Sequence, residues 1–177
     1  MDAPPGPPPN PGSCGSCSLC CTVMKVEMPP EEPKPWGKPC QHLCSKGPGC
    51  SIYRDRPVAC RDFECFWLTS QRWPALALPS GLRPDRCGVV VTVNSSGSII
   101  VHCQYPASWK RSPIREWLVE KAAQTIVIID HHGSDDALLL NPDGQTDPIF
   151  FLGIDPTTNN RLYGHVAGGA PAAGLPG

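Results

Sequence analysis

The cysteine-rich third of this chain begins with the run Cys14-Gly15-Ser16-Cys17-Ser18-Leu19-Cys20-Cys21. Nine of the eleven cysteines lie between Cys14 and Cys65, which is too dense for ordinary core packing. The stretch up to Leu68 also has little helical or strand periodicity and many prolines and glycines, so it needs a cross-link in order to fold. Thiolate sulfur binds soft metals such as zinc and iron. We therefore expect a metal ion to organise this segment.

The spacing of the first thiols narrows the choice of metal. Cys14, Cys17 and Cys20 follow C-x2-C-x2-C, the spacing of the first three ligands in bacterial ferredoxins, although no later cysteine is followed by proline as in that pattern. Two-residue spacings suit a tetrahedral zinc site equally well. We expect iron, either as ions or as a [4Fe–4S] cluster, with zinc as the alternative. Disulfides are disfavoured because the cysteine count is odd and the vicinal pair Cys20-Cys21 is awkward to bridge.

The composition limits the other classes of function. The 177 residues, 40% of them hydrophobic, are enough for one core, alone or with a small cofactor-organised module. Lysine and arginine number 15 against 16 acidic residues, so we expect no nucleic-acid partner. The N-terminus lacks the features of a secretory signal, and the longest apolar runs are too short to cross a membrane. A cytoplasmic protein whose partner is a metal ion is the expectation.

Four segments follow from the pattern of residues. Residues 1–12 are half proline and are expected to be disordered. Residues 13–70 form the cysteine module, and residues 81–152 form a small folded layer. Residues 153–177 are expected to be an irregular tail, because they end in a run of glycine, alanine and proline.

The folded layer has the pattern of an α+β fold in the order ββαββ. Residues 88–93 and 98–103 are β-rich runs, and the turn residues between them predict a hairpin. Ser112-Pro113 predicts a helix start, with Ser112 as N-cap and Pro113 at the first helical position. Two further strands are predicted at residues 125–130 and 137–140, followed by a turn at 141–144. We expect one helix on a small sheet, with the cysteine module packed against it.

Longer motifs connect the cysteines. They are Pro39-Cys40-Gln41-His42, Gly49-Cys50-Ser51-Ile52-Tyr53-Arg54-Asp55-Arg56-Pro57-Val58-Ala59-Cys60 and Arg61-Asp62-Phe63-Glu64-Cys65-Phe66-Trp67-Leu68. Together with the opening run, they resemble the YkgJ-like cysteine-cluster family of zinc- or iron-chelating domains over about residues 13–70. The resemblance implies that the metal ligands are Cys14, Cys17, Cys20, Cys21, Cys40, Cys50, Cys60 and Cys65. Cys44 stands where the family is more variable. Some larger relatives resemble flagellin lysine methylases, an activity we do not carry over because this chain has no separate glycine-rich cofactor loop.

Several neighbouring residues could take part in the site. His42 is a possible nitrogen ligand, and Cys87 could reach back toward the thiols. Gly88 is expected to face Cys103 across the hairpin, so Cys87 and Cys103 should lie near one another, as two buried small side chains. Two groups could surround the thiols: an apolar wall of Phe63, Phe66 and Trp67, and the arginines Arg54, Arg56 and Arg61. Alternatively the arginines pair at the surface with Asp55, Asp62 and Glu64.

A metal-dependent enzyme is the alternative to a metal-binding protein. It could be a transferase acting through the cluster. It could also be a hydrolase, because Asp130-His131-His132 follows an apolar strand and is similar to the Asp-His-His motif of manganese phosphoesterases. Such enzymes need further aspartates from earlier strands, which this chain lacks, so a polar loop is the simpler interpretation of the motif.

Overall fold

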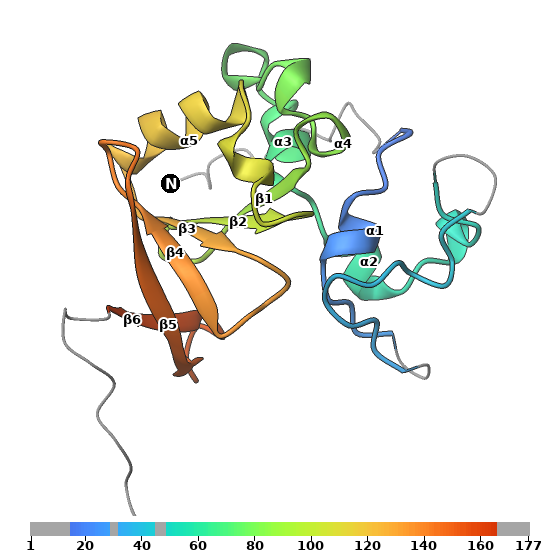
Figure 1. Ribbon diagram of the computed structural model, residues 1–177. Coiled ribbons are helices and arrows are strands. Elements are labelled where there is room, and N and C mark those ends of the chain that lie inside the picture. The colour runs from blue at the N-terminus through green and yellow to red at the C-terminus, as the bar shows by residue number, and fades with distance from the viewer. Residues whose placement is uncertain (1–14, 29–31, 45–48, 166–177) are drawn as a thin grey trace, which may run out of the picture.

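The described part of the chain has a mixed α and β fold. The computed structural model describes residues 15–28, 32–44 and 49–165 (Figure 1). The helices are α1 (Cys20–Val23), α2 (Val58–Asp62), α3 (Phe66–Ser70), α4 (Pro84–Cys87) and α5 (Ile114–Ala122). The strands are β1 (Val89–Val93), β2 (Ile99–Cys103), β3 (Val127–Asp130), β4 (Asp136–Leu140), β5 (Thr146–Ile154) and β6 (Arg161–His165). Short 3-10 turns lie at Tyr53–Asp55, Pro74–Leu76, Ser80–Leu82 and Ser108–Lys110. The disorder expected for residues 1–12 falls outside the described residues.

All six strands form one sheet in sequence order, from β1 at one edge to β6 at the other. Neighbouring strands are antiparallel except β2 and β3, which run parallel. A parallel pair cannot be joined by a tight turn, and here α5 makes the crossover between the two strands. The single helix predicted between the strand pairs therefore explains the one parallel contact in the sheet.

The predicted ββαββ order is incomplete. A fifth strand, β5, follows the turn at residues 141–144, and β6 pairs with it. The prediction of an irregular tail from residue 153 is therefore wrong as far as His165, and residues 166–177 lie outside the described part. Pro148 makes β5 hard to predict from the sequence, because proline lacks a backbone donor and normally argues against an inner strand. It is tolerated here because β6 pairs with β5 only from Ile149 onward.

Two local predictions are off by one residue. Cys103 pairs with Val89 rather than Gly88, because the loop between the strands extends through Ser98. Helix α5 begins at Ile114, Pro113 occupies the N-cap position, and no side chain caps the helix. The predicted capping role of Ser112 is therefore wrong.

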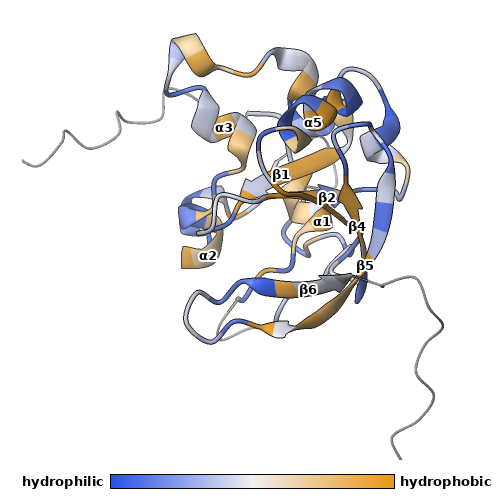
Figure 2. Cartoon of the chain, turned by 90° about the vertical axis from the view of Figure 1, so that its left-hand side faces the viewer, coloured by the Kyte–Doolittle hydropathy of each residue, from blue (hydrophilic) through white to orange (hydrophobic). Residues whose placement is uncertain are grey.

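The two faces of β1 contact different parts of the chain. Val89 and Val91 belong to the main core, which also contains Ile114 and Leu118 of α5. Val90 points to the opposite face, where it packs with Leu19 and Val23. In Figure 1 α5 lies over one side of the sheet, while α1 lies beyond β1, and Figure 2 shows the inner strands β2 and β4 in hydrophobic colours. The cysteine-rich segment thus packs on the sheet through an apolar contact.

Candidate functional site

A cavity of about 290 Å³ brings together most of the predicted thiol ligands. Its lining contains seven of them: Cys17, Cys20, Cys21, Cys40, Cys50, Cys60 and Cys65. His42 lines the same cavity. Much of the remaining wall is apolar and includes Met24, Ile52 and Phe63. Side chains that are as far as 48 positions apart in the sequence therefore line one cavity.

Short backbone contacts hold these segments together. The Cys40 N–H donates to the Cys21 carbonyl oxygen at 2.9 Å, which fixes the second cysteine segment against α1. Leu43 and Cys50 form an isolated antiparallel bridge. In α2, the Cys60 N–H donates to the Pro57 carbonyl oxygen at 2.9 Å. Hydrogen bonds between segments, together with those within turns, therefore place the thiols around the cavity.

The remaining candidate ligands are placed elsewhere. Cys14 lies outside the described residues. Cys44 does not line the cavity, and its N–H donates to the Gly49 carbonyl oxygen at 3.0 Å. Cys87 is buried in the main core, where its thiol contacts the Leu82 carbonyl oxygen at 3.5 Å. Cys103 lies in the same core, as expected for two buried small side chains.

The thiols influence one another electrostatically. A hydrogen bond with the Cys20 thiol is the main cause that lowers the pKa of Cys21 to about 7, with help from the charges of Lys34 and Arg56 and against the effect of burial. Burial raises the pKa of Cys50 and of Cys60, and the thiolates nearby raise it further. The Cys21 thiol thus ionises more readily than an ordinary cysteine, whereas Cys50 and Cys60 resist ionisation.

Lys34 is a buried cation beside the thiols that the sequence did not reveal. Its side chain is 3% exposed, and its amine donates to the carbonyl oxygens of Thr22, Met24 and Pro35. Burial lowers the pKa of Lys34, and the charges of the surrounding thiolates, with Cys40 the largest, oppose that shift. A lysine between two prolines resembles any surface lysine in a sequence, so no pattern could have identified it.

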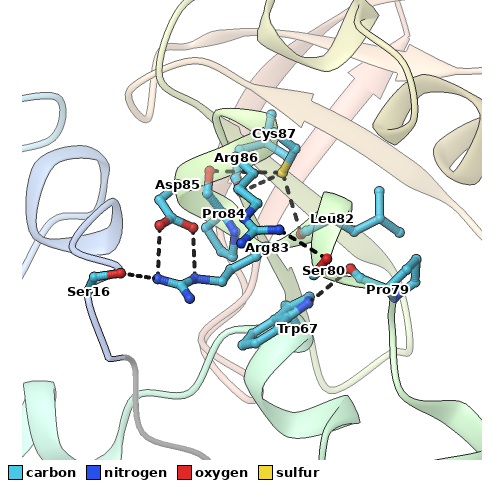
Figure 3. A network of polar contacts seen from close by, with 11 residues as sticks. Ser16, Trp67, Pro79, Ser80, Leu82, Arg83, Pro84, Asp85, Arg86 and Cys87 are labelled. Atoms are coloured by element: carbon cyan, nitrogen blue, oxygen red, sulfur yellow. Dashed lines mark hydrogen bonds and ion pairs between the residues drawn. The ribbon is translucent and has the colours of Figure 1, made fainter.

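An arginine network ties the first cysteine loop to the start of the sheet (Figure 3). Arg83 donates to the Ser16 hydroxyl at 2.6 Å and pairs with Asp85 at 2.8 Å. Its guanidinium also lies 5.9 Å from the centre of the Trp67 ring. Ser16 directly precedes Cys17, so this network fixes the position of one thiol relative to α4.

A second polar group lies where the cysteine-rich segment meets the sheet. Asp130 is 1% exposed and accepts from His102 Nδ1 at 3.2 Å and from the Gly133 N–H at 3.1 Å. The ring of Trp36 stacks on His102, with 5.4 Å between ring centroids. His131 and His132 stack on each other at 3.9 Å rather than joining the Asp130 carboxylate. Asp130 therefore holds the His102 ring and the turn at Gly133 in place.

Comparison with protein-family models, curated proteins and solved structures gave no match to this chain. Within residues 15–28, 32–44 and 49–165, no three histidine, cysteine, aspartate or glutamate side chains are already grouped closely enough to hold a metal ion. No helix in those ranges is long and apolar enough to cross a membrane.

Proposed function

We propose that this protein binds iron or zinc through clustered cysteine thiolates. The observation that supports the proposal is the common cavity of the seven thiols, all of which the resemblance to the YkgJ-like family implies as ligands. His42 faces the same space and could supply a nitrogen ligand. Cys14 belongs to the same opening run and is the eighth proposed ligand.

The donor chemistry fits a soft metal. Thiolates select zinc, iron–sulfur clusters or copper(I) over magnesium and calcium. No disulfide joins any two of the cysteines that the structure describes. Seven thiols in one cavity exceed the four that one tetrahedral ion needs, so the set suits a polynuclear centre or two ions. Binding would release the thiol protons and draw the cysteine loops together.

The charges near the cavity also fit thiolate ligands. Several thiolates around one metal centre carry net negative charge, which is costly in a partly buried site unless cations lie nearby. Lys34 and Arg56 are close enough to lower the pKa of Cys21. They would stabilise the ionised ligands without binding the metal themselves.

The test is anaerobic purification followed by metal analysis and a visible spectrum. We expect bound iron, with sulfide and broad absorption near ~400 nm for a cluster, or colourless zinc. Cys60→Ser should reduce the metal content, whereas Cys44→Ser, which changes a cysteine outside the cavity lining, should not. Metal-free protein that is fully folded in the cysteine-rich segment would contradict the proposal.

A further inference from the structure

A second hollow lies beside the thiol cavity. It has a volume of about 560 Å³ and is lined by a short stretch of chain around α2 together with Glu27. Three arginines line it: Arg54, Arg56 and Arg61. Arg56 also lines the thiol cavity, as do Pro57 and Ala59, so the two hollows share a wall.

The three arginines are not equivalent. Arg56 donates to the Tyr53 carbonyl oxygen at 2.9 Å, and its guanidinium lies 3.7 Å from the centre of the Tyr53 ring. It also acts electrostatically on Cys21. Arg54 and Arg61 are exposed, and the guanidinium of neither has a hydrogen bond or ion pair with another described residue. Arg56 is thus committed to the thiol site, whereas Arg54 and Arg61 are available to a ligand.

The acidic residues nearby do not neutralise these charges. Among the described residues, the lining of both hollows holds five basic side chains and two acidic ones, although the whole chain carries a net charge of −1. Glu27 already pairs with Lys25 at 2.8 Å, and Glu64 pairs with Arg72. The predicted pairing of Glu64 with the arginines of this stretch is therefore wrong. Asp55 is the other acidic side chain among the described residues that line the arginine hollow.

We propose that this arginine hollow binds a small polycarboxylate anion that carries the metal to the thiols. Guanidinium groups bind carboxylates through paired hydrogen bonds, and two of them in one hollow select a ligand with several carboxylates. A divalent ion bound there as a carboxylate chelate lies next to the thiol cavity. Its metal–oxygen bonds would be replaced by metal–sulfur bonds, the thiol protons would pass to solvent, and the carboxylate would leave without any change of oxidation state. This carrier role rests on the proposed metal binding, whereas the anion site does not.

The experiment measures citrate binding to the reduced, chelator-treated full chain by calorimetry. The variant R54Q/R61Q should bind citrate at least about tenfold more weakly than the unchanged protein, because both unpaired guanidiniums are lost. The control K38Q/K110Q removes two exposed charges outside the hollow and should change the affinity less than about twofold. Circular dichroism establishes that each variant is folded. Zinc uptake from zinc citrate should slow in R54Q/R61Q and stay unchanged in the control.

Several outcomes would overturn the proposal. These are no heat of binding up to about 10 mM citrate, equal weakening in both double variants, inorganic phosphate binding as tightly as citrate, or a hexaglutamate peptide binding more tightly. Equal rates of zinc uptake would refute the carrier role alone. A protein that binds citrate through these arginines but takes up no zinc or iron would instead refute the proposed function and leave the anion site standing.

Discussion

Replacing Gly133 by alanine tests the contact that holds the cysteine-rich segment on the sheet. Gly133 has φ +63°, and a Cβ added there would lie 2.5 Å from Trp36 Nε1. An alanine in the left-handed conformation costs about 1–2 kcal/mol. Overpacking against the indole adds about 1–3 kcal/mol, since backbone and ring must move apart. We therefore expect Gly133→Ala to lower the free energy of unfolding by about 2–5 kcal/mol.

Gly97→Ala is the matched control. Gly97 has φ +79°, but a Cβ there would meet nothing within 4 Å, so only the backbone cost of about 1–2 kcal/mol applies. Urea unfolding followed by circular dichroism gives the free energy for each variant, and tryptophan fluorescence reports on the indole environment. We expect the fluorescence of the folded protein to change only in Gly133→Ala. Equal losses of stability and unchanged fluorescence in both variants would show that Trp36 does not pack on Gly133.

Three further predictions concern the thiols and their neighbours. In metal-free protein, mass spectrometry should find Cys21 alkylated about tenfold faster at pH 8 than at pH 6, because with a pKa of about 7 its reactive thiolate accumulates between these values. Cys103, whose pKa burial raises to about 12, should stay unmodified. A rate of Cys21 alkylation that does not change with pH would contradict this prediction. Lys34→Met should lower the free energy of unfolding in urea by about 1–3 kcal/mol, since the Thr22 and Met24 carbonyl oxygens lose their donor; an unchanged midpoint would refute that role. A strong chelator should make the loops carrying Cys40 and Cys50 sensitive to protease, and unchanged cleavage would count against a metal there.

The sequence was informative where one local pattern determines the structure. Runs of β-favouring residues identified β1 and β2, and the turn residues between them predicted their hairpin. The predicted helix lies between β2 and β3. The sequence did not predict β5, because Pro148 argues against an inner strand. The strand accepts this proline because the pairing with β6 starts only at Ile149, and that pairing depends on the tertiary structure. β6 has only five residues, and it directly precedes the residues that lead into the Gly- and Ala-rich tail.

The candidate site, too, was predictable in part from local spacing and in part not. Spacing alone grouped Cys17 and Cys20, whereas Cys40, Cys50 and Cys60 were proposed through the family resemblance before the structure placed them at one cavity. Cys44 belongs to the same cysteine-rich segment, yet it lies outside the lining, where its N–H donates to the Gly49 carbonyl oxygen. Which cysteines line the cavity depends on contacts between segments of the fold, such as the hydrogen bond between Cys40 and Cys21, and no spacing rule contains these contacts.

The packing of α1 changes what a metal would have to do in this protein. The sequence suggested that the whole cysteine-rich segment folds only through a metal cross-link. Leu19, Val23 and Val90 nevertheless form a buried cluster between α1 and β1, and burying such side chains contributes on the order of 1.5–3 kcal/mol each. Apolar burial therefore anchors α1 to the sheet without any metal. The energy of metal binding would then act on the loops around Cys40 and Cys50, whose described residues belong to no such cluster, and close them over the thiols near α1.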